Sequence, residues 1–273
     1  AVYALFFSSC YKISETVYVY IDNDDTRDSI QTKIETAARP SCLWGYSLIE
    51  TLKPMTVRPG RYAIEPEEGQ LATYRKLASG NQSPVNLTIP SVRTIDKLAG
   101  VLGRKLMIDS TAICEALQDS AFCAPLSYDT ATIMALFIPN TYQVYWNVSL
   151  EDLMKRMQKE NAAFWKAEGR SELAQKLGLT PNEVITVASI VEEETANNAE
   201  KPMVAGMYLN RLKQEMPLQA DPTVKYALKD FSLRRIYHKH LTIDSPYNTY
   251  KNVGLPPGPI RIPTVASIDA VLH

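Results

Sequence analysis

The chain has 273 residues, of which 45% are hydrophobic, with 29 lysines and arginines against 30 aspartates and glutamates. This length accommodates two domains and a sizeable core. The balanced charge excludes an electrostatic basis for binding nucleic acid, so no nucleic-acid partner is expected.

The cysteines and histidines give no metal signature. The four cysteines lack paired C-x-x-C spacing, and two of the three histidines form a lone H-x-H. We therefore predict no metal and no cofactor, and we expect buried free thiols, with a disulfide in an oxidising compartment as the alternative. The residues concerned are Cys10, Cys42, Cys114, Cys123, His238 and His240.

The chain opens with the short apolar run AVYALFFSSC. A membrane-spanning helix needs about 20 apolar residues, and this run is shorter. We expect residues 1–15 to be the remnant of an N-terminal anchor or linker. A lipobox ending at Cys10 is a weaker alternative, because Phe7 stands where an aliphatic residue is usual.

Strand and helix signals alternate over residues 16–64. Residues 16–21 are β-branched and aromatic, which predicts a strand. Residues 24–26 introduce a helix that runs to about residue 36; a second helix over 43–52 and a second strand over 60–64 follow. The β-α-α-β order predicts a small separate unit, which we place at residues 16–90.

The remaining pattern is mainly helical. We predict a helix over 69–78, a strand over 85–89, helices within 95–117 and a long helix over 150–168. The fold class is therefore α+β, with a mainly helical domain at residues 91–273.

A buried helix with an acidic end is predicted after residue 180. Thr180, Pro181 and Glu183 form a T-x-x-E capping box with proline at the first helical position. From residue 184 to 191 nearly every side chain is apolar, so the helix should lie inside the domain. It ends in three glutamates, which must reach a surface, an interface or a cleft.

The three glutamates differ in their expected surroundings. Glu193 continues the polar stripe of the helix and is expected to face water. Glu192 and Glu194 each lie over apolar residues, and periodicity leaves open which of them is half-buried. Desolvation would raise the pKa of such a carboxyl and let it donate a proton. A merely solvated acidic end is the alternative, although carboxylates oppose the negative end of the helix dipole.

Residues after 200 add a second helix and two polar loops. Residues 200–213 have apolar Met203, Val204, Met207 and Tyr208 at helical spacing, which predicts an amphipathic helix. Asp221 is expected to cap a short helix that has Pro222 at its first position. The segment SPYNTY suits carbohydrate, because aromatic faces stack on sugars and amides pair with hydroxyls. For GLPPGPI, a rigid turn without a ligand is the favoured interpretation.

Five sequence words follow one another in the last third of the chain: VASIVEEET, YLNRLK, MPLQADPTVKYAL, SPYNTYKNVGLPPGPI and ASIDAVLH, with PNTY preceding them. This order resembles the catalytic domain of endolytic murein transglycosylases, which are bacterial enzymes. The resemblance implies that Glu192, the first acid of the I-V-E-x-E-T motif, is catalytic. The implied substrate-binding residues are Gln219, Asp221, Tyr247, Asn248 and Tyr250.

The resemblance also implies a reaction and a location. One glutamate would protonate the bond between N-acetylmuramic acid and N-acetylglucosamine within a nascent strand, then activate the muramyl 6-hydroxyl to give a 1,6-anhydro end. The family is anchored in the bacterial inner membrane with its catalytic domain outside the cytoplasm. Peptidoglycan and cell-wall synthases are the implied partners.

Further expectations follow from the same resemblance. The unit at residues 16–90 is expected to be LysM-like and to hold glycan, with a structural spacer as the alternative. Relatives continue past a helix like the last one here, so residues 91–273 are expected to be a C-terminally truncated catalytic domain. The competing functions are a non-catalytic glycan-binding scaffold and a hydrolytic muramidase in which Asp221 would serve as the second carboxylate.

Overall fold

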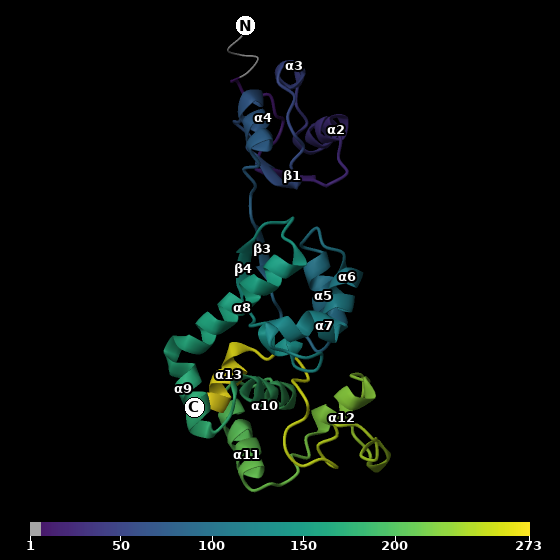
Figure 1. Cartoon of the computed structure of the whole chain (residues 1–273), viewed down its shortest axis with the longest axis vertical. Coiled ribbons are helices and arrows are strands. Elements are labelled where there is room, and N and C mark those ends of the chain that lie inside the picture. The colour runs from purple at the N-terminus through teal and green to yellow at the C-terminus, as the bar shows by residue number, and fades with distance from the viewer. Residues whose placement is uncertain (1–6) are drawn as a thin grey trace. The chain divides into compact units, whose positions relative to one another are not determined.

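Figure 1 shows the computed structural model, which describes residues 7–273. Helices and two small sheets make an α+β protein, as the sequence predicts. The chain divides into two compact units: one holds the residues up to 87 with 105–108 and 143–149, and the other holds 88–104, 109–142 and 150–273. Residues 1–6 of the expected anchor remnant lie outside the described residues. Within 7–273, no helix is long and apolar enough to cross a membrane.

The first unit contains the predicted β-α-α-β order followed by a helix. Strands β1 and β2 pair antiparallel, with Val17 opposite Ile64 and Ile21 opposite Gly60. Thr26 and Ser29 form a capping box at the start of α2, which fixes where that helix begins. The elements are β1 (Val17–Ile21), α2 (Arg27–Ala38), α3 (Trp44–Leu52), β2 (Gly60–Ile64) and α4 (Gln70–Ser79).

The core of this unit follows from the periodicity of its elements. Val19 and Ile21 are buried on one face of β1, and Ile30 and Ile34 are buried on one face of α2. Buried tyrosines fill the remaining space, and Tyr46 and Tyr74 meet edge to face with ring centroids 5.9 Å apart.

The second unit is mainly helical. A second two-stranded sheet pairs β3 (Val85–Thr88) with β4 (Thr141–Val144), and residues 85–87 and 143–144 of these strands belong to the first unit. The helices are α5 (Ile95–Gly103), α6 (Ser110–Gln118), α7 (Ser120–Cys123), α8 (Leu150–Lys166), α9 (Arg170–Leu177), α10 (Pro181–Glu194), α11 (Lys201–Lys213), α12 (Asp221–Leu228) and α13 (Val265–Leu272), with short 3₁₀ turns between some of them.

Helix α10 lies at the centre of this unit and carries the acidic end. All eight residues from 184 to 191 are buried, and α9, α11, α12 and α13 pack against the helix. The predicted capping box is present: Thr180 accepts from the Glu183 amide, and Glu183 accepts from the Thr180 amide. The buried Ser189 hydroxyl accepts from the Ile260 amide at 3.0 Å, so it ties the loop before α13 to the helix.

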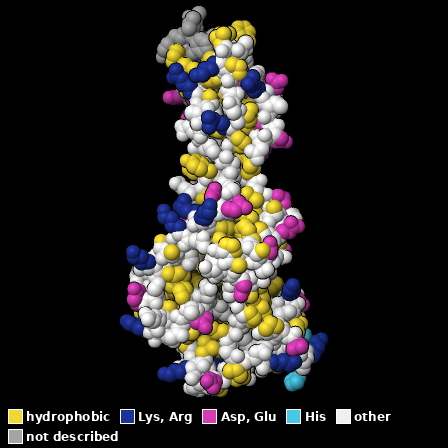
Figure 2. Space-filling view, viewed as in Figure 1, with side chains coloured by type: hydrophobic (Ala, Val, Ile, Leu, Met, Phe, Trp, Pro, Cys, Tyr) yellow, Lys and Arg dark blue, Asp and Glu magenta, His cyan; other side chains and the backbone are white. Residues whose placement is uncertain are grey.

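Helix α11 buries only part of the expected apolar face: Tyr208 is buried and Val204 is half-buried, but the two methionines are exposed. Ala205 and Tyr208 are buried, whereas Met203 and Met207 are 72% and 44% exposed. The methionines thus lie on the solvent side, and the smaller Ala205 permits the close approach to α10 and α13. Acidic and basic side chains are both present on the face of the protein shown in Figure 2, as the balanced composition predicts.

Candidate active site

Glu192 is held through one of its two carboxylate oxygens. Oε2 accepts hydrogen bonds from the Thr264 amide at 3.2 Å, the Thr264 hydroxyl at 2.5 Å and the Ser267 hydroxyl at 2.5 Å. The Lys201 ammonium lies 3.1 Å from the same oxygen. Oε1 accepts no hydrogen bond from the residues that the structure describes. The side chain is 12% exposed, so the carboxyl is half-buried with one oxygen unoccupied.

The N-terminal ends of two helices supply these donors. Lys201 is the first residue of α11, while Thr264 precedes α13 and Ser267 lies in its first turn. Helix N-termini present free amides and a positive dipole end, which favour a carboxylate. Sequence analysis missed all three residues, because they lie 9, 72 and 75 positions from Glu192. Thr264, two residues before ASIDAVLH, marks the start of the second helix, but nothing in the sequence shows that this start lies against Glu192.

The pKa of Glu192 is lowered, whereas the sequence led us to expect it to be raised. Burial alone would raise the pKa of this carboxyl, but the hydrogen bonds from Ser267, Thr264 and Lys201 outweigh burial and lower the pKa to about 2. The resting Glu192 is therefore ionised at neutral pH. The expectation of a raised pKa was wrong because periodicity reveals burial but not the donors that other helices bring.

Glu193 was predicted to face water, but the structure shows it largely buried in ion pairs. The Arg93 guanidinium donates to both of its oxygens, at 2.6 and 2.9 Å, and Arg261 donates at 2.9 Å. Only 13% of the Glu193 side chain is exposed. Because Arg261 also donates to the Ser91 hydroxyl and carbonyl, Glu193 ties two distant loops to the end of α10.

Glu194 is the exposed acid of the three. Its Oε1 accepts from the Tyr208 hydroxyl at 2.6 Å, and burial together with this bond raises the pKa of that tyrosine. Of the two candidates that periodicity left open, Glu192 is therefore the half-buried one.

Asp221 does not cap helix α12. The N-cap is Ala220, whose amide donates to the Thr249 hydroxyl and whose carbonyl accepts from the Thr223 hydroxyl, so the helix begins one residue earlier than predicted. The Asp221 carboxylate instead accepts from the Tyr250 hydroxyl at 2.6 Å. Burial and this bond raise the pKa of Tyr250 to about 12.

The structure brings Gln219 to the same loop pair. Its amide donates to the Thr249 carbonyl at 3.1 Å, next to Tyr250 in the chain. Its side chain is exposed and accepts from Arg211 at 3.1 Å. Gln219, Asp221 and Tyr250 therefore form one polar cluster, with side chains that a ligand could reach.

Asn248 and Tyr247 have packing roles instead. Asn248 is fully buried and donates to the carbonyls of Leu241 and Ile243 at 2.9 and 2.8 Å, while its carbonyl oxygen accepts from the Tyr250 amide. It holds the loop in shape, and its role in substrate binding stays a prediction. Half-buried Tyr247 packs on Tyr226, with ring centroids 4.7 Å apart.

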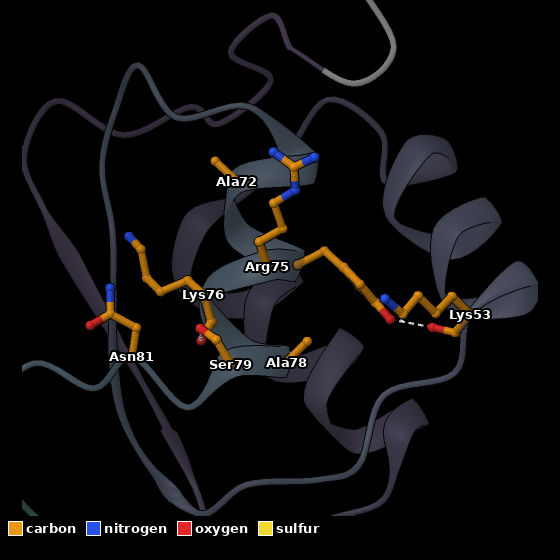
Figure 3. Close-up of a pocket in the computed structure, with 8 residues that line it drawn as sticks. Lys53, Ala72, Arg75, Lys76, Ala78, Ser79 and Asn81 are labelled. Carbon is orange, nitrogen blue, oxygen red and sulfur yellow. Dashed lines mark hydrogen bonds between the residues drawn. The ribbon is translucent and has the colours of Figure 1, made fainter.

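The first unit has a separate hollow of about 620 Å³ beside α4 (Figure 3). Lys53, Arg75, Lys76, Ser79 and Asn81 contribute to its lining, which contains no carboxylate. Lys76 is occupied by an ion pair with Glu68 at 2.7 Å. This hollow has no proton-exchanging acid, in contrast to the end of α10.

The described residues contain no cluster of histidine, cysteine, aspartate and glutamate that could hold a metal ion. Among them the four cysteines are free thiols, and only Cys123 is fully buried.

The ionised Glu192 carboxylate accepts hydrogen bonds from residues at the N-terminal ends of α11 and α13. This arrangement in a mainly helical unit defines a site for acid and base chemistry. The model of the YceG-like family matches residues 19–273, and the chain therefore belongs to this family. An endolytic murein transglycosylase of Bacillus subtilis (strain 168) is 34% identical over 218 residues, which are 74% of this chain and 60% of that protein.

Two further similarities extend this result. The protein of the same description from Streptococcus pneumoniae (strain R6) is 29% identical over 250 residues, 80% of this chain and 44% of its own length. The crystal structure of a YceG-like protein from Listeria monocytogenes has a TM-score of 0.62 and 28% identity, and the match covers 96% of this chain and 91% of that one. The chain thus spans about half the length of the curated relatives.

Proposed function

We propose that this chain is an endolytic lytic transglycosylase that cleaves between N-acetylmuramic acid and N-acetylglucosamine inside peptidoglycan strands. The observation that carries the proposal is the unequal hydrogen bonding of the two Glu192 carboxylate oxygens. Within residues 7–273, four hydrogen bonds end on Oε2 and none ends on Oε1. A fixed carboxylate with one unoccupied oxygen can both take up and deliver a proton. The names of the relatives support murein as the substrate.

The reaction balances without water or a protein nucleophile. The bond from the muramyl anomeric carbon to the bridging oxygen breaks, and a bond from that carbon to the muramyl 6-oxygen forms. The proton leaves the 6-hydroxyl and ends on the released oxygen of N-acetylglucosamine, with Oε1 as the carrier. Because the nucleophile belongs to the substrate, its effective concentration is high. Because Glu192 starts ionised, Oε1 takes the 6-hydroxyl proton before it delivers that proton to the leaving oxygen, which reverses the order that the family resemblance implies, and the carboxylate ends ionised again.

The cluster of Gln219, Asp221 and Tyr250 is the proposed glycan-binding surface. Its amide, carboxylate and phenol can pair with hydroxyl and N-acetyl groups, and an exposed aromatic edge can pack on a sugar ring. We assign Asn248 and Tyr247 to support of this loop. The hydrolytic muramidase remains the rival reaction, because Asp221 is not committed to a helix cap and could act as a second carboxylate.

The first unit is proposed to be LysM-like and to hold the glycan strand. Its order β1–α2–α3–β2 and its antiparallel strand pair support this reading. We further propose that the protein acts outside the cytoplasm, at the bacterial inner membrane through an anchor at its N-terminal side, and with cell-wall synthases as partners.

The test is digestion of purified sacculi in heavy-oxygen water, followed by mass spectrometry. We expect 1,6-anhydromuramyl ends within the strands and no solvent oxygen in the products. Reducing ends that carry the label would show that the chain is a hydrolytic muramidase. Uncut strands would show that it is a glycan-binding protein without this activity. Glu192→Gln should abolish cleavage, because an amide cannot exchange the proton. Glu194→Gln is the matched control at the same helix end, and it should cleave like the unaltered chain.

A further inference from the structure

We propose that Lys201 is a positioning residue for this reaction: it fixes Oε2 of Glu192 and thereby reserves Oε1 for the glycan. This inference rests on the proposed function. It concerns a residue that touches the carboxylate and not the reacting atoms of the substrate.

Lys201 has almost no contact with solvent. Its side chain is 3% exposed, and its ammonium reaches the Glu192 carboxylate at 3.1 Å and the Thr264 hydroxyl at 3.4 Å. Within residues 7–273, no other carboxylate lies within ion-pair distance of it. A buried ammonium without a counter-charge is strongly unfavourable, so the fold commits Lys201 to Glu192. Lysine at this position therefore carries a specific electrostatic task.

The four hydrogen bonds to Oε2 of Glu192 determine which carboxylate oxygen exchanges protons. A proton on Oε2 would point at the hydrogens of the Lys201 ammonium and the Thr264 amide, which have no lone pair to accept it. A proton on Oε1 leaves all four bonds to Oε2 in place. Both transfers, from the muramyl 6-hydroxyl and to the leaving oxygen, must then pass through Oε1. Lys201 thus sets the orientation of the carboxyl for both steps.

The other charged groups around Glu192 are already paired. On its own helix, Glu193 is bound by Arg93 and Arg261, and Glu194 accepts from Tyr208. From α12, Asp221 accepts from Tyr250. From α13, Asp269 pairs with Arg170 of α9 at 2.9 Å. Lys201 is accordingly the cation that contacts Glu192, and its hydrogen bond adds to those of Ser267 and Thr264 in lowering the pKa of this carboxyl.

Removal of Lys201 has a defined consequence for the carboxyl. The ammonium and its hydrogen bond lower the pKa of Glu192, so Lys201→Met should raise that pKa, by about one to three pH units for the loss of one close opposite charge. Loosening of Oε2 should also lower kcat by about 10²-fold with a smaller change in KM, because misplacement of a reacting group by about 1 Å has that effect.

The decisive experiment titrates the carboxyl directly. The ¹³C signal of the Glu192 carboxyl is followed by NMR from pH 3 to pH 8 in the unaltered chain, Lys201→Met and Lys201→Arg, with Lys213→Met as the control at an exposed lysine of the same helix. We expect no titration in the unaltered chain or in Lys213→Met, and a titration inside this range in Lys201→Met. Lys201→Arg keeps the charge, so its Glu192 should stay ionised.

Each outcome bears on Lys201 separately from the proposed reaction. If Glu192 stays ionised throughout in Lys201→Met, the positioning role is wrong, and so it is if kcat falls only in step with the melting temperature. If Lys201→Met fails to fold, Lys201→Arg decides, since a titrating Glu192 there would overturn the idea. Absence of anhydro products from every variant would sink the proposed function, whereas the NMR titration would still report the grip on Glu192.

Discussion

The pair of Glu192 and Lys201 makes a quantitative prediction about stability. A fall in the Glu192 pKa from its ordinary 4.5 to about 2 corresponds to about 3 kcal/mol of folding free energy. Because the Oε1 side is open to solvent, screening reduces this, and we expect Glu192→Gln to lose about 2 kcal/mol. In a chain of this size, that loss lowers Tm by about 4–8 °C.

The sign of the pH dependence follows from the lowered pKa. The contribution of ionised Glu192 is fully present above pH 4.5, and it is lost as the pH falls through 2. The difference in stability between the unaltered chain and Glu192→Gln should therefore be constant from pH 6 to pH 8 and shrink below pH 4.5. Urea denaturation at a series of pH values measures it.

A double-mutant cycle isolates the pair. Glu192→Gln leaves the buried Lys201 ammonium without a counter-charge, whereas Glu192→Gln with Lys201→Met removes both charges. We expect the double variant to be more stable than the sum of the two single effects predicts, by about 1–3 kcal/mol. Additive effects, or a Glu192→Gln variant with an unchanged denaturation midpoint, would refute the coupling. The double variant should still fail to cleave glycan, which separates stability from catalysis.

Three further substitutions test the surroundings of the site. Asn248→Ala removes three hydrogen bonds of a buried amide and should destabilise by about 1–3 kcal/mol, with activity falling only in proportion to the folded fraction; a stable but inactive variant would instead mean glycan contact. Tyr250→Phe removes the bond to Asp221 and should lose about 1 kcal/mol in urea denaturation but more in glycan turnover, and equal activity would exclude Tyr250 from binding. Gly258→Ala would place a Cβ 2.1 Å from the Ala131 carbonyl oxygen and should lower Tm, with Gly206→Ala, which meets nothing within 4 Å, as the control that should not.

Local sequence patterns predicted the elements of the fold because their signals are local. The Thr180 capping box predicted the start of α10, and the β-branched and aromatic residues 16–21 predicted β1. Helix α11 shows the limit of this approach: its periodicity was correct, but the pattern alone could not decide whether Met203 or Ala205 faces the core. That choice depends on how closely α10 and α13 approach.

The site was predicted less completely, since its properties depend on distant partners. The motif identified Glu192, but its lowered pKa comes largely from Ser267 and Thr264, more than 70 residues away. Glu193 looked solvated because neither Arg93 nor Arg261 is visible to helical periodicity. Asp221 looked like a cap because D-P is a common helix start, and only the bonds at Ala220 move that start by one residue.

The long stretch of chain between Glu192 and its donors Thr264 and Ser267 also determines when these contacts can form during synthesis. Thr264 and Ser267 follow Glu192 by 72 and 75 residues, and contacts over such separations are slow to form because the loop-closure entropy must be overcome first. A nascent chain that has emerged only as far as residue 260 carries the complete I-V-E-x-E-T motif, yet of these donors its glutamate has Lys201 alone. The full set of hydrogen bonds on Oε2 therefore requires synthesis beyond residue 267.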